Sequence, residues 1–121
     1  MILVDTSVWI EFFRRGSAAS RLAELLAEGG VLTHDFVVGE IALGSLGRRR
    51  AEVLRDLQLI PRLPVLPERE VLHLVETRGL SGAGIGWVDA HLLASAAAAA
   101  RSLWTLDRRL GRAAARLAIA V

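Results

Sequence analysis

The sequence predicts an α/β sandwich, in which helices cover both faces of a central parallel sheet of four to five strands. Two observations lead to this fold class. Short apolar runs alternate with longer segments of helical periodicity along all 121 residues, a pattern typical of parallel strands joined by helical crossovers. Several of these runs end at or beside an aspartate. A chain of this length can bury one hydrophobic core, so we expect a single domain over residues 1–121.

The N-terminal part of the chain predicts one strand and two helices. Residues 1–5 form an apolar run that ends on a carboxylate, which indicates a buried parallel strand. Thr6 or Ser7 can cap the helix that follows, through residue 14. Leucines at helical spacing predict a second helix over residues 20–28, which a pair of glycines ends.

The middle of the chain repeats this alternation. Residues 31–35 predict a second strand that again ends on aspartate, and residues 36–46 a helix. Apolar positions at helical spacing predict another helix over residues 48–59. A third strand is expected over residues 63–66, and the prolines in and around it place it at an edge of the sheet.

The C-terminal part completes the sheet. It contains, in order, a helix over 68–80, a glycine-rich loop over 81–86, a helix over 87–100, a strand over 102–106, a helix over 108–116 and a last strand over 117–121. In parallel α/β sheets the functional site lies beyond the carboxyl ends of the strands.

The composition limits the function classes. There is no cysteine, which excludes disulfides, zinc–thiolate sites and thiol nucleophiles. The pI of about 10.9 accompanies a net charge of only +2, because every basic side chain is arginine, so a high pI alone does not indicate nucleic-acid binding. No membrane span and no signal peptide are apparent, and we expect a cytoplasmic protein. The mean hydropathy of +0.42 suggests that a partner covers some apolar surface.

Four acidic residues stand out by position. Asp5 ends the first strand, Glu40 lies on the helix after the second strand, Asp89 is in the first turn of a helix, and Asp107 follows the fourth strand. Each has a structural alternative: Asp89 could favour the helix dipole, Asp107 could be an N-cap, and Glu40 could be solvated. Asp5 is the hardest to explain structurally, because a carboxylate at the end of an apolar strand is costly unless it is paired or binds a cation.

Clustered carboxylates repel one another, so such a cluster holds either protons or a cation. A hard divalent ion such as Mg²⁺ or Mn²⁺ suits oxygen ligands and retains water. It can activate that water and neutralise charge on a phosphodiester. Other acidic α/β sites fit less well: a receiver domain would need a lysine, and a haloacid-dehalogenase phosphatase would need an acid where Ser7 stands. A dinucleotide site would need its glycine motif after the first strand.

In order and spacing, these motifs resemble the PIN domain and, within it, the VapC toxin family. The motifs are Val4-Asp5-Thr6-Ser7, Glu40, Asp89 before an alanine-rich helix, and Thr105-Leu106-Asp107. The resemblance implies a PIN-like three-layer α/β/α sandwich and an endoribonuclease in which the four acids are catalytic and bind one or two Mg²⁺ or Mn²⁺ ions. It also implies an RNA substrate, a VapB-type antitoxin and a homodimer. Arg108 follows the last acid where many members have an acid or aromatic nearby, so one or two metals remain open. A non-catalytic PIN-like module that binds RNA or protein is the alternative.

Further residues are assigned supporting roles. Hydroxyls that could hold a metal-bound water, or else cap and pack, are Thr6, Ser7 and Thr105. Candidates for RNA phosphate binding are Arg14, Arg15, Arg108, Arg109 and Arg112, whereas residues 48–50 are expected to be a solvated helix start. An apolar cleft for the antitoxin is expected from Trp9, Phe12, Phe13, Phe36, Val37 and Ile41.

Two expectations concern surfaces. The homodimer is expected to use the helices over 68–80 and 87–100, since alanines 94–100 allow close approach, although the same alanines could pack within one subunit. Of the three tryptophans, Trp9 and Trp104 are expected in the core, and Trp87 could line the substrate groove.

Overall fold

The computed structural model describes residues 1–121 and contains three strands and eight helical segments. The strands are β1 (Ile2–Val4), β2 (Val31–Leu32) and β3 (Ser102–Trp104). The helices are α1 (Thr6–Phe13), α2 (Ala19–Ala27), α3 (Asp35–Leu43), the short 3₁₀ helix η1 (Gly47–Arg49), α4 (Arg50–Leu57), α5 (Glu68–Thr77), α6 (Trp87–Ala98) and α7 (Arg108–Arg116). All seven predicted helical regions are present, with boundaries shifted by up to three residues.

The sheet is parallel, and its strand order is β2-β1-β3. Ile2 pairs with Val31 on one side of β1 and with Ser102 on the other. The predicted count of four to five strands is wrong, because the two outer segments make only isolated bridges, Thr33 to Arg62 and Leu103 to Ala120. The segments predicted as the third and last strands therefore lie beside the sheet, but each contributes only one bridge and is not a strand.

Local chemistry explains the short edges. At one edge, Thr33 donates to the carbonyl of Pro61 and accepts from Leu63, but prolines, which have no N–H, flank that bridge and end the pairing. At the other edge, Ala118 has a left-handed φ of +60° just after α7, a conformation that a β-strand does not contain. Only the two hydrogen bonds of Leu103 with Ile119 and Val121 form there.

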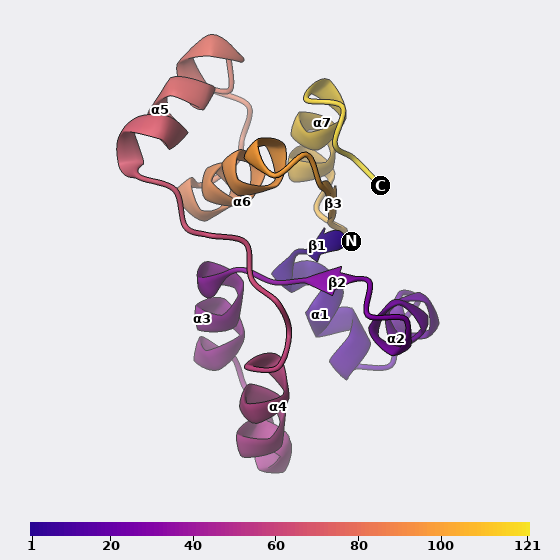
Figure 1. The fold of residues 1–121 in the computed structure, drawn as a ribbon. Helices are drawn as coiled ribbons and strands as arrows, with labels where there is room; N and C mark the ends of the chain where they lie inside the picture. The colour runs from indigo at the N-terminus through magenta and orange to yellow at the C-terminus, as the bar shows by residue number, and fades with distance from the viewer.

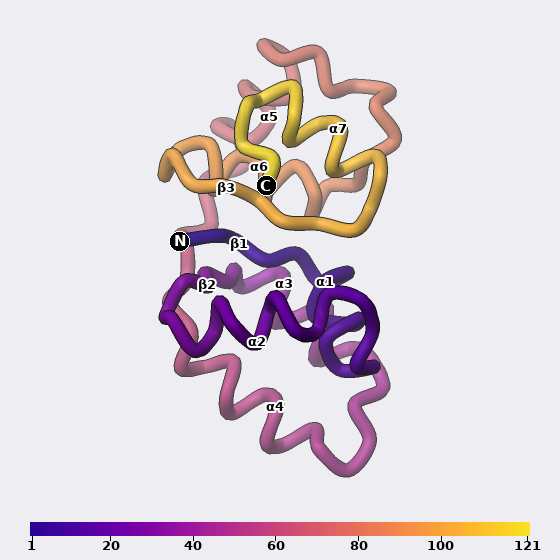
Figure 2. Tube along the Cα trace, turned by 90° about the vertical axis from the view of Figure 1, so that its right-hand side faces the viewer, coloured from indigo at the N-terminus to yellow at the C-terminus, as the bar shows by residue number.

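Helices flank the parallel sheet, as predicted. Figures 1 and 2 show α1 to α4 gathered on the β2 side of β1 and α5 to α7 on the β3 side, with both chain termini near the strands. α1 packs against α2 and α3, and α6 packs against α5, β3 and α7. One main cluster of 23 buried hydrophobic residues joins these layers. None of the helices is long and apolar enough to cross a membrane.

The helix α6 is buried through most of its length. Every residue from Ala90 to Ala96 is at most 5% exposed. The first half of the alanine-rich segment therefore packs within one subunit, which is the alternative that the sequence left open, whereas Ala98, Ala99 and Ala100 are exposed.

The N-terminus of α3 is held by a buried polar network. His34, which is fully buried, accepts the Phe36 N–H at Nδ1 over 3.1 Å, so its Nε2 carries the proton toward Ser95 Oγ at 3.2 Å. Ser95 in turn donates to the carbonyl of Pro64. This network ties the start of α3 to α6 and so sets the direction in which α3 presents Glu40.

Candidate active site

Asp5 is the buried centre of the candidate site. It follows β1 and is 6% exposed, and its backbone N–H donates to the carbonyl of Trp104. Its Oδ2 accepts the Ser7 hydroxyl at 2.8 Å and the Thr105 hydroxyl at 2.7 Å. No arginine or histidine forms an ion pair with it. Two neutral donors thus orient a buried carboxylate whose charge is left uncompensated.

The two hydroxyls around Asp5 also receive hydrogen bonds from the backbone. Ser7 Oγ accepts the N–H of Leu106, and Thr105 Oγ1 accepts the N–H of Asp107. Each hydroxyl proton is therefore directed at Asp5. The expectation that Thr6 or Ser7 caps α1 is wrong, since Asp5 occupies the N-cap position and no side chain caps the helix.

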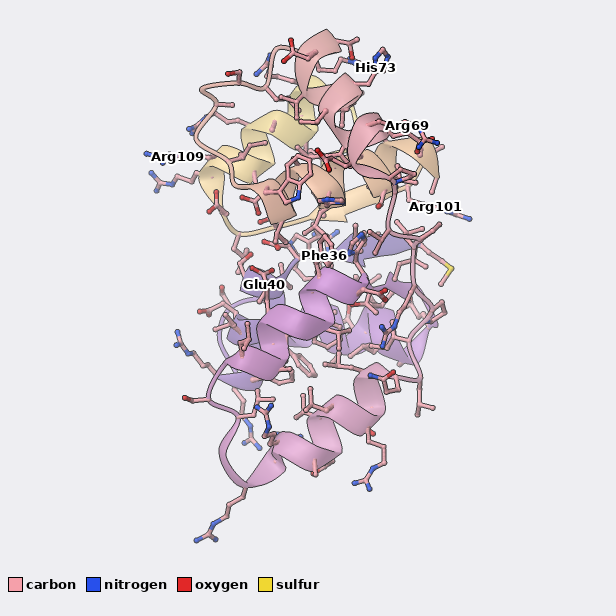
Figure 3. All side chains as sticks on the ribbon, turned by 90° about the vertical axis from the view of Figure 1, so that its left-hand side faces the viewer. Phe36, Glu40, Arg69, His73, Arg101 and Arg109 are labelled. Carbon is pink, nitrogen blue, oxygen red and sulfur yellow. The ribbon has the colours of Figure 1, made fainter.

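Glu40 reaches the same place from α3. Its Oε1 accepts the Thr6 hydroxyl at 2.8 Å. Each of the three hydroxyls expected to support the site therefore donates to one of its carboxylates. Figure 3 shows Glu40 and Phe36 on the side of α3 that faces the α5–α7 half of the molecule.

Asp89 and Asp107 lie at helix starts, and each has part of its carboxylate committed to the backbone. Asp89 Oδ2 accepts the Gly86 N–H at 2.9 Å. Asp107 Oδ1 accepts the N–H groups of Arg109 and Leu110, which makes it the N-cap of α7. The capping role considered for Asp107 is therefore real, and one oxygen of each carboxylate makes no hydrogen bond in the chain.

The acids influence one another electrostatically. Burial raises the pKa of the Glu40 carboxyl; the hydrogen bond from Thr6 opposes this, and the charges of Asp5 and Asp89 add to the rise. Burial also raises the pKa of Asp89, the Gly86 N–H opposes it, and the charges of Asp5 and Asp107 raise it further. Four carboxylates from four separate segments are thus linked electrostatically, Glu40 with Asp5 and Asp89, and Asp89 with Asp5 and Asp107.

The donor set fits a hard divalent cation. All its ligand atoms are oxygens, and like charges that raise one another's pKa are relieved by a cation. No three carboxylates or histidines lie close enough to chelate one ion together. Mg²⁺ matches this arrangement because it is usually held by one or two carboxylates and keeps several waters.

A groove of about 440 Å³ runs from this cluster between α1, α3 and α4. Its lining includes Thr6 and Glu40 at the acidic end, apolar Ile10, Phe13, Ile41, Leu46 and Val53, and the basic Arg14 and Arg49. Phe13 and Ile41 were predicted for such a cleft. Phe12 lines two neighbouring hollows beside Phe13.

The rest of the predicted cleft needs correction. Trp9 and Val37 are buried at 3% and 0% exposure, so neither side chain is free to face a partner. The Trp9 ring packs against those of Phe12 and Phe13. Phe36 lies elsewhere, with its ring 4.7 Å from that of His91 on α6.

The five predicted RNA-binding arginines, Arg14, Arg15, Arg108, Arg109 and Arg112, are all exposed. None forms an ion pair with an acid. Arg109 crosses the glycine-rich loop, where a Cβ on Gly84 would lie 2.7 Å from its Cδ, and Figure 3 shows it pointing outward. Arg49 lines all three main hollows, although the sequence favoured a solvated helix start for residues 48–50. The run of three arginines was its only local signal.

Comparisons with known proteins agree with this arrangement. Residues 2–116 match the PIN domain family. The chain is 47% identical over 122 residues to Ribonuclease VapC32 of Mycobacterium tuberculosis, in two strains, covering 100% of this chain and 96% of the relative. The crystal structure of PAE2754 from Pyrobaculum aerophilum superimposes with a TM-score of 0.68 at 19% identity, over 99% of this chain and 87% of that one, which supports the fold. This chain therefore belongs to the PIN-domain family, and within it to the VapC branch.

Proposed function

We propose that this protein is a metal-dependent endoribonuclease, the toxin component of a VapBC-type toxin–antitoxin system. The observation that carries the proposal is that Glu40 and Asp89 are partly buried near the charges of Asp5 and Asp107, and that burial and these charges raise the pKa of both groups. A bound cation would relieve this repulsion. The 47% identity to a protein named as a VapC ribonuclease supports the same activity.

The proposed roles of the residues follow from their contacts. Asp5 and Asp89, with Glu40 and Asp107 around them, would hold Mg²⁺ or Mn²⁺. A bound cation of this kind supplies an activated water and neutralises charge on the phosphodiester. Ser7 and Thr105 are positioning residues, because their hydroxyl protons hold the Asp5 carboxylate in one orientation.

We further propose that a VapB-type antitoxin occupies the groove between α1, α3 and α4. Ile10 is 40% exposed and Leu43 is 90% exposed near its rim, and such apolar side chains suit the face of an amphipathic helix. Glu40 at the acidic end would attract an arginine or lysine of the same partner. The homodimer remains part of the proposal, with α5 as its surface, because Leu72 there is 44% exposed whereas the middle of α6, Ala90 to Ala96, is buried.

Incubation with RNA tests the function directly. The purified chain should cleave total cellular RNA in Mg²⁺ or Mn²⁺, and its expression should arrest growth. Co-expression of a short protein encoded beside its gene should restore growth, and the two proteins should co-purify. Binding of RNA without any cleavage, in either cation, would instead establish the non-catalytic binding module.

The close approach of Arg109 to Gly84 can be tested with a matched pair of glycine variants. Gly84 and Gly82 have nearly the same left-handed φ, +78° and +77°, but an alanine Cβ would strike Arg109 only at position 84. Gly84→Ala should therefore displace Arg109, while Gly82→Ala adds similar backbone strain without moving it. If Arg109 binds a phosphate, Gly84→Ala and Arg109→Ala should both reduce the salt dependence of RNA affinity by about 0.7 in log–log slope.

The measurement is RNA binding in EDTA between roughly 50 and 200 mM salt, the range in which phosphate contacts weaken steeply. Gly82→Ala should keep the wild-type slope. Equal slopes for the two glycine variants would show that Arg109 makes no phosphate contact.

A further inference from the structure

An exposed tryptophan stands beside the acidic cluster and has no role in the site described so far. Trp87 is the first residue of α6 and is 46% exposed, whereas Trp9 and Trp104 are 3% and 9% exposed. Large aromatic side chains are usually buried. An exposed indole next to a candidate nuclease site therefore suggests contact with a ligand.

The position of Trp87 is tied to one of the acids. Gly86 precedes it, and the Gly86 N–H donates to Asp89 Oδ2 at 2.9 Å. The same turn of α6 thus fixes both the indole and a carboxylate of the cluster. Trp87 and Asp89 are the first and third residues of α6, so the indole lies at the same end of the helix as this acid.

The indole ring of Trp87 is also held in place by a second aromatic ring, that of His91. Its ring lies 4.7 Å from that of His91, one turn along α6, at an interplanar angle of 86°. His91 is 5% exposed, and its ring lies 4.7 Å from that of Phe36 at 75°. This aromatic trio (Phe36, His91 and Trp87) is a stack of edge-to-face contacts that fixes one part of the indole and leaves the rest open.

The aromatic trio and the acids come from the same two helices. Phe36 and Glu40 are four residues apart on α3, so they are neighbours on the helix surface, and Figure 3 shows both on the side toward α6. Trp87 and Asp89 come from the first turn of α6. An exposed indole, supported edge-to-face by His91, thus lies at the start of the helix that carries Asp89.

We infer that Trp87 is a stacking platform for an unpaired nucleobase next to the phosphodiester that is cut. The inference rests on the proposed ribonuclease function and adds to it a contact that requires single-stranded RNA. Bases stack on aromatic side chains with little regard to their identity. Because a base inside a duplex has both faces covered, Trp87 would favour loops and single strands.

The test uses intrinsic fluorescence, since the chain has no tyrosine and its other two tryptophans are in the core. The probes are single-stranded octaribonucleotides A8, C8 and U8 and an abasic ribose-phosphate octamer, bound in EDTA so that no cleavage occurs. The three base-containing octamers should quench the fluorescence of the wild type and of the control variant Trp104→Phe. They should not quench that of Trp87→Phe, and the abasic octamer should quench none of the proteins.

Affinities of the same octamers, measured by anisotropy, separate stacking from apolar bulk. Trp87→Leu should weaken binding about 5- to 150-fold, the range expected for loss of one base–aromatic stack, while Trp87→Phe should keep most of the affinity. Leucine preserves an apolar residue at the helix start, so loss of fold is not expected, and thermal unfolding checks it.

The outcomes of these experiments distinguish a failure of the stacking inference from a failure of the proposed ribonuclease function. If the wild type cleaves RNA while Trp87→Leu binds every octamer as tightly as the wild type, the stacking platform is refuted and the nuclease stands. Quenching by the abasic octamer equal to that by A8 would also refute it. If the wild type neither binds nor cuts any RNA, the proposed function fails, and this inference with it.

Discussion

Asp5→Asn should reduce RNA cleavage by about 1,000-fold or more, the upper range seen when one preorganised charge-stabilising group is removed from a site. Asparagine can keep its oxygen toward the hydroxyls of Ser7 and Thr105, which both donate to Asp5 Oδ2. Its amide NH₂ then replaces the other oxygen. The side chain loses its charge and a cation ligand while its shape is preserved.

The fold should survive this change. Asp5 is 6% exposed and has no cationic partner, so removing its charge removes a desolvation cost. The melting temperature should be unchanged or higher, as measured by thermal unfolding without divalent ions. An active site that opposes stability in this way is the expected trade-off for a buried uncompensated carboxylate.

Asp35→Asn is the matched control for Asp5→Asn. Asp35 also follows a strand of the sheet, but its carboxylate pairs with Arg62 at 2.7 Å, away from the acidic cluster. This variant should cut RNA at the wild-type rate and lose at most about 1 kcal/mol of stability, as expected for a partly exposed ion pair. Cleavage that persists in Asp5→Asn would remove Asp5 from the catalytic site.

Removal of divalent cations should abolish cleavage, and their addition should stabilise the fold. A cation at one hundred times its Kd stabilises the folded state by about 2.7 kcal/mol. For a domain of this size, that corresponds to roughly 10 °C in Tm. Thermal unfolding in Mg²⁺ or Mn²⁺ against EDTA measures the shift, and full cleavage in excess EDTA would refute the metal-dependent mechanism.

The size of this shift should depend on pH. The pKa values of Glu40 and Asp89 are raised above their ordinary 4.5 and 3.8, so the folded protein binds these protons more tightly than the unfolded chain. The stability that these two groups contribute is therefore fully present below their ordinary values and is lost as pH rises through the raised ones. A cation replaces the protons, so its effect on Tm should be large near pH 7.5 and small near pH 4.

Buffers without divalent cations, brought to the same ionic strength with monovalent salt, control for general electrostatic screening. Asp5→Asn gives a second control, because a cluster with one charge fewer should show a smaller cation-induced shift at pH 7.5. A shift that is the same at both pH values would mean that the cation binds away from Glu40 and Asp89.

Local patterns in the sequence were sufficient to predict the helices and to select the four acids as candidates. Helical periodicity and glycine stops depend on neighbours within a few residues, so α2, α5 and α7 lie close to their predicted ranges. A parallel sheet then requires that residues after its strands share one edge. That requirement is enough to place Asp5 and Asp107 together without coordinates.

Tertiary structure decided everything that depends on which elements touch. The two outer segments make only single bridges, because proline lacks an N–H at one edge and Ala118 is left-handed at the other. Trp9 and Val37 are buried in the core, and α6 is buried within the subunit from Ala90 to Ala96.

The orientation of the side chains in the candidate site also depended on the tertiary structure. The hydroxyls of Ser7 and Thr105 are 98 residues apart, yet both donate to Asp5, and the ring of Phe36 reaches Trp87 only through His91. Sequence patterns encode local backbone conformation and local burial, and so the sequence by itself determined the helices, the inner strands and the candidate acidic residues. Contacts between distant side chains depend on strand order and on the packing of helices across the sheet, and so only the folded chain determined how those parts meet.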